Sequence, residues 1–243
     1  MKTVCYAAVL VFGLSTVMVS CGKHHNKGGC SNINNEKMAK ASVITYGVDL
    51  GLSVNWAESN VGANSPEEFG YQIPYGNISG SIYYSQNTPA NISGTISDIA
   101  VKQMGDGWRM PTEVEMRELI ERCEMTIDVI NDVKGVRLTG KNGKSIFLPA
   151  CGSGLSAFWD DEEKGTKYRI AEPQTVGNIG YYWTGSELGA GRLQIEKARE
   201  MGFEVISKAD PAVLTFNITK KTRSVTSESA FRNCFPVRAV HEK

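Results

Sequence analysis

The chain has 243 residues, a length that allows one sizeable domain or two small ones. Basic and acidic residues number 26 each, so the formal net charge is zero, and neither sign forms a long run. This balance argues against nucleic acid or an acidic lipid surface as an electrostatic partner. After the first twenty residues, no segment is long and apolar enough to cross a bilayer.

The first twenty residues have the pattern of an export signal. Lys2 supplies a positive charge, and the apolar run over 4–19 is shorter than the roughly 20 residues of a membrane span. Ser20, a small residue, stands directly before Cys21. This ending resembles the lipobox of bacterial lipoproteins, whose cysteine is acylated and becomes the mature N-terminus, although Met18 stands where leucine is commoner. An ordinary signal peptide that ends near a cysteine is the alternative.

Lipid on Cys21, palmitate included, would anchor the protein stably, since each buried methylene contributes about 0.8 kcal/mol. The segment that follows is polar and rich in glycine, a composition typical of a flexible tether. We therefore expect a lipoprotein of the bacterial outer membrane, displayed on its periplasmic or cell-surface face. The chain divides into a signal peptide over 1–20, a lipidated tether over 21–41 and one domain over 42–243.

The domain is expected to start with short strands at Val43–Tyr46 and Val48–Leu50. A helix over 112–123 is the best-specified element, because Thr112 can cap it while Glu115 reaches back to complete a capping box. Apolar residues then recur on one helical face and are expected to face the core: Met116, Leu119, Ile120 and Cys123.

Later in the chain, Asn142-Gly143 lies between two apolar runs, Val136–Thr139 and Ser145–Leu148, which is the strongest hairpin signal in the sequence. A second helix is predicted over Arg192–Met201, and Gly152–Gly154 reads as a turn. The fold class is α+β, mainly antiparallel, with two helices and long loops. Further strands are expected at Gly180–Thr184, Ala212–Ile218 and Cys234–Val240.

Four cysteines are available to the mature chain, since Cys5 leaves with the signal peptide and Cys21 takes lipid. In an oxidising periplasm a disulfide can join two of the three in the domain, and buried free thiols are an equal alternative. The four are Cys30 in the tether and Cys123, Cys151 and Cys234 in the domain.

Five short motifs follow one another along the domain: Val48–Ala57, Gly105–Thr112, Ser145–Ala150, Gly180–Thr184 and Phe235–Arg238. Together they resemble the Fibrobacter succinogenes major paralogous domain family, which is abundant in lipoproteins of Bacteroidetes. The resemblance spans nearly all of 43–240 and implies a C-type-lectin-like fold with long, variable loops. The chain departs from the family in a helix-bearing insert over 189–211, so a binding surface does not transfer directly.

Histidine is scarce, with only His24, His25 and His241, so neither a catalytic triad nor a histidine zinc site has a histidine clearly inside the domain. We therefore expect no enzyme activity, no cofactor and no metal site. Acidic residues 160–163 and Glu172 offer oxygen ligands for calcium, but their order differs from that of lectins, and a solvated acidic loop is preferred.

Aromatic and arginine side chains, which dominate the recognition of sugars and proteins, gather in the C-terminal half. Four are expected to bind ligand: Trp159, Arg192, Arg223 and Arg232. Four others are expected to be structural: Trp56, Trp108, Tyr182 and Trp183.

These observations predict a membrane-anchored, non-enzymatic lipoprotein that recognises a glycan or a protein. Two alternatives stay open. One is an enzyme of the formylglycine-generating kind that uses Cys234, and the other is a structural or adhesin-like component of a surface assembly.

Overall fold

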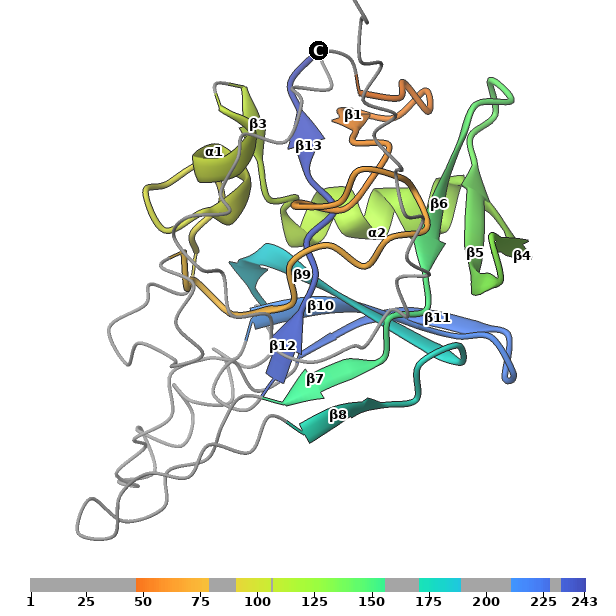
Figure 1. The fold of residues 1–243 in the computed structure, drawn as a ribbon. Helices are drawn as coiled ribbons and strands as arrows, with labels where there is room; N and C mark the ends of the chain where they lie inside the picture. The colour runs from red at the N-terminus through yellow and green to blue at the C-terminus, as the bar shows by residue number, and fades with distance from the viewer. Residues whose placement is uncertain (1–46, 79–90, 106, 156–170, 189–210, 228–232) are drawn as a thin grey trace, which may run out of the picture.

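The structure is a computed structural model that describes residues 47–78, 91–105, 107–155, 171–188, 211–227 and 233–243 (Figure 1). The predicted signal peptide and tether, the strand at Val43–Tyr46 and the helix at Arg192–Met201 lie outside these residues. The described chain consists mostly of antiparallel sheets with two short helices, so the predicted α+β class is confirmed.

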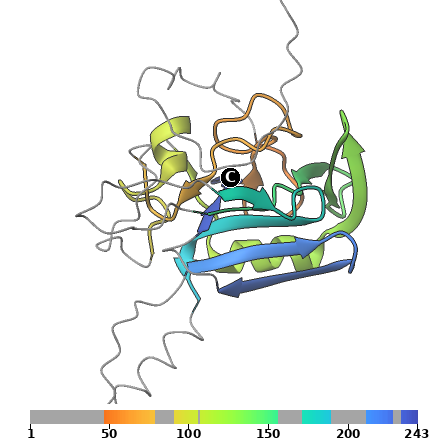
Figure 2. The same cartoon turned by 60° about the horizontal axis from the view of Figure 1, so that its bottom comes forward.

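A three-stranded antiparallel sheet lies at the centre of the domain, and its strands run side by side in Figure 2. Both of its faces are buried. Tyr182 and Leu214 point into one hydrophobic core, and Trp183 and Val213 point into a second core on the opposite face. In spatial order the strands are β11 (Thr222–Ser227), β10 (Pro211–Asn217) and β9 (Ile179–Glu187).

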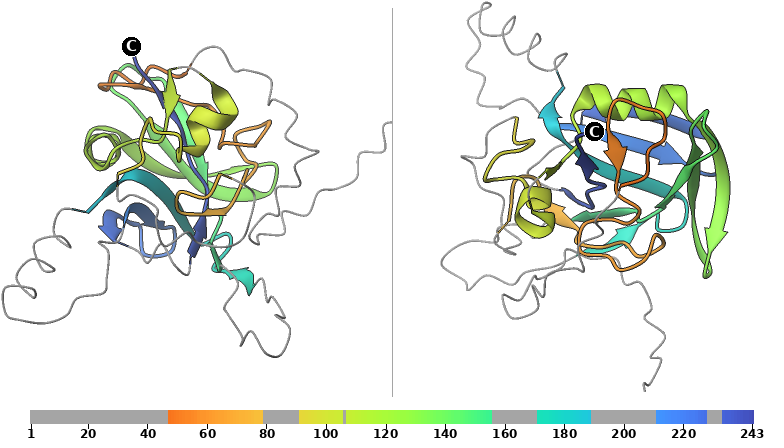
Figure 3. Two further views of the ribbon diagram at one scale, coloured as in Figure 1. Left: turned by 90° about the vertical axis from the view of Figure 1, so that its left-hand side faces the viewer. Right: turned by 90° about the horizontal axis from the view of Figure 1, so that it is seen from above.

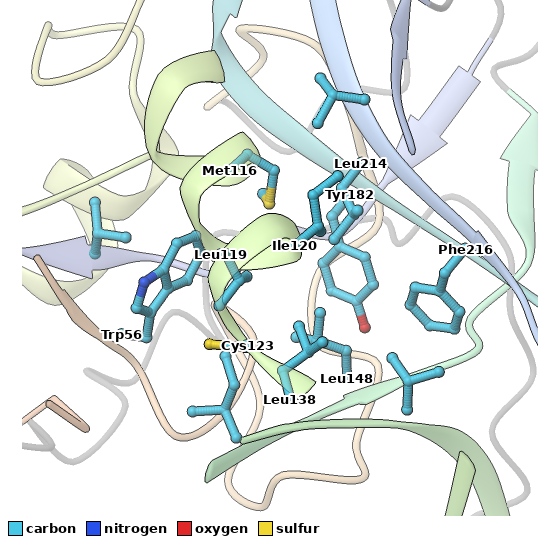
Figure 4. Close-up of a cluster of buried hydrophobic side chains, with 14 of the residues drawn as sticks. Trp56, Met116, Leu119, Ile120, Cys123, Leu138, Leu148, Tyr182, Leu214 and Phe216 are labelled. Atoms are coloured by element: carbon cyan, nitrogen blue, oxygen red, sulfur yellow. The ribbon is translucent and has the colours of Figure 1, made fainter. Parts of the chain in front are cut away.

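The predicted helix is α2, Glu113–Arg122, and it lies against this sheet (Figure 3). Its capping box is present: the Thr112 hydroxyl accepts the Glu115 N–H at 3.3 Å, and a Glu115 carboxylate oxygen accepts the Thr112 N–H at 2.7 Å. The predicted apolar stripe of the helix is buried in the first core, where it meets the sheet (Figure 4): Met116, Leu119, Ile120 and Cys123.

The predicted hairpin is confirmed as β5 (Val133–Thr139) and β6 (Ser145–Pro149), with Thr139 paired to Ser145 and Gly143 at φ 80° in the turn. A strand that the sequence did not predict, β4 (Glu124–Ile130), pairs with the outer edge of β5.

Two further sheets complete the described fold. The prediction of a single strand over Cys234–Val240 is wrong. The chain forms two short strands there, β12 in one sheet and β13 in the other. One sheet has the order β2 (Ile73–Pro74), β12 (Asn233–Phe235), β7 (Ser153–Leu155) and β8 (Ala171–Gln174). The other has the order β1 (Asn55–Trp56), β13 (Val240–His241) and β3 (Trp108–Arg109).

Two local predictions also need correction. The expected turn at Gly152–Gly154 is partly strand, because Gly154 lies in β7 and pairs with Cys234. In the expected strand Val48–Leu50 only Val48 pairs, through an isolated bridge to Trp56. A short helix, α1 (Ile99–Met104), was not predicted and packs in the second core.

Candidate functional site

The structure describes one of the four predicted ligand-binding residues. Arg223 is the second residue of β11, next to the tight turn that joins β10 to β11. Trp159, Arg192 and Arg232 lie outside the described residues, as does the predicted lipidation site Cys21. The strands that lead into and out of those segments are described, and they show where each segment is attached.

The ends of β7, β8 and β12 meet at one place. Leu155, the last residue of β7, pairs with Asn233 at the start of β12 and with Ala171 at the start of β8. Segment 156–170, which carries Trp159, is therefore attached at both ends next to the residue that follows Arg232.

A second group of strand ends holds segment 189–210, which carries Arg192. Glu187 near the end of β9 pairs with Pro211 at the start of β10. On the other side of β10, Ala212 pairs with Ser227, the last residue of β11. The two ends of 189–210 and the start of 228–232 therefore lie at the same end of the central sheet.

The two groups of strand ends belong to one end of the domain. Segment 228–232 joins the end of β11 to the start of β12, and these six residue steps reach at most about 20 Å. Segment 79–90 returns at the same place, since the Glu187 backbone N–H donates to Asn91 Oδ1 at 3.1 Å. We call this the loop-root end, toward the lower left of Figure 1. It is defined by Asn91, Leu155, Ala171, Glu187, Pro211, Ser227 and Asn233.

Hydrogen bonds between separate stretches of chain hold the loop-root end together. The backbone N–H of Ile92 donates to the Gly185 carbonyl at 2.9 Å, and the Thr184 hydroxyl donates to the Ala212 carbonyl at 2.8 Å. The buried indole of Trp183 donates to the Ile73 carbonyl at 2.8 Å. The segments are thus attached to a well-connected base.

Asp98 organises the stretch that follows segment 79–90. Its fully buried carboxylate accepts backbone N–H groups from Gly94 and Ala100, each at 2.8 Å, and from Met110 at 2.7 Å. Burial raises the pKa of this carboxyl, and the same N–H donors oppose the rise. Asp98 therefore serves as the cap of α1 and as a link to the residue after β3.

A neighbouring ion pair joins β3 to α2. The Arg109 guanidinium donates to both carboxylate oxygens of Glu115, at 2.8 and 2.6 Å, and reaches Glu242 at 2.9 Å. Although burial acts to raise it, the pKa of Glu115 is lowered, because Arg109 and the Thr112 N–H stabilise the charged form.

Two exposed apolar side chains lie beside the loop-root end, and the sequence analysis did not single them out. Ile96 is 89% exposed in the turn after Asn91, and Val114 is 72% exposed in the first turn of α2. The Glu113 N–H donates to the Ser186 hydroxyl at 3.2 Å, which places that helical turn against the end of β9. The feature of the sequence that could have identified Val114 is an apolar side chain on the otherwise charged face of the helix.

Arg223 is half-buried and packs near the end of α2. Its guanidinium lies close enough to the Cys123 thiol to act on the thiol's pKa, which is raised by burial and by Glu118 and lowered by Arg223. Nη1 of Arg223 is buried and has no hydrogen-bond partner within the described ranges. Such a cation near a helix C-terminus is stabilised by the helix dipole, so its environment fits a packing role as well as a binding one.

The structure contradicts one of the two alternatives for the cysteines of the domain, the disulfide between two of them. Cys123 and Cys151 are free and buried, whereas Cys234 is disulfide-bonded. A disulfide between two of these three is therefore wrong, and the partner of Cys234 lies outside the described residues. The thiol on which the formylglycine-type alternative depends is not free in this structure.

Cys151 lies in a buried polar cluster with Tyr182 and Arg238. Its sulfur is 3.4 Å from the Tyr182 hydroxyl, which donates to the Pro149 carbonyl at 2.8 Å. Burial raises the pKa of the Cys151 thiol to about 12 and also raises that of Tyr182. A buried thiol that stays protonated is a poor nucleophile at neutral pH.

Arg238 in the same cluster is fully buried. Its pKa is lowered to about 10, mainly because burial disfavours the charged form. Its guanidinium donates to Asn60 Oδ1 at 2.9 Å, to the Ala57 carbonyl at 3.1 Å, to the Phe147 carbonyl at 2.8 Å and to the Glu58 carbonyl. Arg238 thus ties the last strands to the first loops of the domain.

Comparisons with protein-family models, with curated proteins and with solved structures find no match. The family resemblance therefore stays a prediction, as does the C-type-lectin-like fold. Within the described ranges, no group of three or more His, Cys, Asp or Glu side chains is placed to hold a metal ion. No helix in those ranges is long and apolar enough to span a membrane.

Proposed function

We propose that the protein is an acylated lipoprotein of the bacterial outer membrane that binds a glycan or a protein ligand through the segments attached at its loop-root end. The observation that supports this most is the convergence of four segments, 79–90, 156–170, 189–210 and 228–232, on one end of a well-connected scaffold.

Binding residues are commonly carried on loops that a rigid scaffold positions. Three of the four segments supply the side-chain types that dominate recognition, namely Trp159, Arg192 and Arg232. An indole stacks on sugar rings or fills an apolar pocket, and a guanidinium donates in a planar fork to carboxylates and carbonyls. The C-type-lectin-like fold belongs to the same proposal, because it presents long loops in this way.

The described surface beside the segments also suits a ligand. Ile96 and Val114 are the most exposed large apolar side chains of the described residues, and Val114 follows Glu113, whose backbone N–H donates to the Ser186 hydroxyl.

Substitution of the predicted contact residues tests the proposal. The full-length lipoprotein, extracted in detergent, is applied to a printed glycan array, and envelope proteins that co-purify with it are identified in parallel. Trp159→Ala and Arg232→Ala are each expected to weaken the binding of a bound glycan or co-purifying protein by about tenfold or more, which is roughly 1.4 kcal/mol.

Val129→Ala is the matched control, because Val129 is 52% exposed on β4, away from the loop-root end (Figure 1). This variant should bind the ligand with the affinity of the unchanged protein. Arg223→Ala does not test this surface, because Arg223 pairs with Phe216 beside the β10–β11 turn, whereas Ser227 of the loop-root end lies at the other end of β11. If Trp159→Ala and Arg232→Ala together leave the affinity unchanged, the loop-root end is not the binding surface.

A further inference from the structure

Cys234 has a disulfide partner that can be identified by elimination. It is the second residue of β12, is fully buried and is disulfide-bonded. The two other cysteines in the described ranges are free. The chain has six cysteines, so the candidates that remain are Cys5, Cys21 and Cys30.

The proposed export and lipidation remove two of these candidates. Cys5 would leave with the signal peptide, and the sulfur of Cys21 would be bonded to lipid. We infer that Cys30 and Cys234 form a disulfide in the mature lipoprotein. This inference rests on the proposed function, and it closes the tether onto β12.

The surroundings of Cys234 suit an incoming sulfur. Its neighbours in the sheet are Pro74 on β2 and Gly154 on β7. A Cβ atom at Gly154 would lie 3.1 Å from the Cys234 Cβ, so any larger residue at position 154 would crowd the Cys234 side chain.

A buried acceptor beside the same space also points to a covering segment. Gln72 is 1% exposed, and its Oε1 would lie 3.2 Å from a Cβ at Gly154. This oxygen has no hydrogen-bond partner within the described ranges. A buried acceptor left without a donor costs about 1–3 kcal/mol, so a segment that covers Cys234 would gain by donating to it.

Disulfide formation needs an electron acceptor, which the bacterial periplasm provides as an oxidised thiol–disulfide oxidoreductase. The two thiols lose two protons and two electrons, and one S–S bond forms between Cys30 and Cys234. The disulfide of the oxidoreductase takes up the two electrons and two protons and becomes a dithiol.

The bond shortens the connection between lipid and domain. Cys30 is nine residue steps from Cys21, which span at most about 30 Å, whereas the 26 steps from Cys21 to Gly47 span up to about 90 Å. Because Cys234 follows Asn233 of the loop-root end, the disulfide keeps this end near the membrane. The protein would then bind its ligand close to the bilayer surface.

Peptide mapping without reduction tests the bond. The membrane-extracted full-length lipoprotein is denatured, alkylated at acidic pH to prevent exchange, and digested with trypsin. Cys30 and Cys234 fall in separate peptides with one cysteine each, Gly28–Lys37 and Asn233–Arg238. These peptides are expected as one linked species that reduction separates and that Cys30→Ser abolishes, whereas Cys123→Ser leaves it intact.

Recovery of both peptides alkylated and unlinked would overturn the inference, as would a link from Asn233–Arg238 to any other peptide. The unchanged chain alone decides between these outcomes, even where a variant fails to accumulate. The acyl group is read separately on Cys21–Lys23, so loss of the disulfide with lipid present leaves the proposed function standing. A link between Cys21–Lys23 and Asn233–Arg238 would overturn both.

Discussion

At the scale of single residues, Arg238 joins several separate parts of the domain. It is fully buried, and its four donor contacts reach a side chain and three carbonyls from the first loops and from β6. Removing one partner from a buried, hydrogen-bonded group leaves the others unsatisfied, which costs more than the bond itself contributes.

Arg238→Met is therefore expected to lower the free energy of unfolding by about 3–5 kcal/mol, measured by urea denaturation. Arg122→Met is the control, because the Arg122 side chain is 67% exposed and its distance to Glu118 is 3.7 Å. Such an exposed pair contributes about 0–1 kcal/mol. Equal stability of the two variants would show that the buried guanidinium does not hold the loops.

Sequence reasoning could assign the buried aromatic residues but not this arginine. Trp56, Trp108, Tyr182 and Trp183 are all at most 4% exposed, as predicted, because large aromatic side chains in strand-like runs are rarely left in water. Arginine is mostly exposed in proteins, and only the tertiary fold reveals a buried one.

At the scale of elements, the helix and the hairpin were predictable because each carries two agreeing local signals. Helix α2 has both a capping box and an apolar stripe, and the β5–β6 hairpin has Asn-Gly between apolar runs. Strand β4 lacks such agreement, since Ile127 and Val129 face solvent and are 45% and 52% exposed. Helix α1 has six residues, too few to show a helical period.

The helix cap gives a prediction at this scale. Thr112→Ala removes the oxygen that accepts the Glu115 N–H and should lower the free energy of unfolding by about 1 kcal/mol. Thr112→Ser keeps a hydroxyl at the cap and should stay within a few tenths of a kcal/mol of the unchanged protein. Urea denaturation of both variants makes the comparison, and an equal loss in both would mean that the hydroxyl does not act as a cap.

At the scale of the whole molecule, the loop-root end arises from pairings between distant parts of the chain. Leu155 pairs with Asn233, and Glu187 meets both Asn91 and Pro211. No local sequence pattern indicates such long-range contacts, so the sequence suggested candidate binding residues by their type but not the place where their segments are attached. For the same reason it left the cysteine pairing open, although Cys123 was rightly placed in the apolar stripe of the helix.

We propose that a lipid on Cys21 holds a binding domain at the membrane. The most direct test is metabolic labelling of cells with an alkyne-tagged palmitate, followed by detection of the tag on the purified protein. The unchanged protein is expected to carry the label, and Cys21→Ser is expected to lack it. An exported protein without label, or equal labelling of Cys21→Ser, would contradict it.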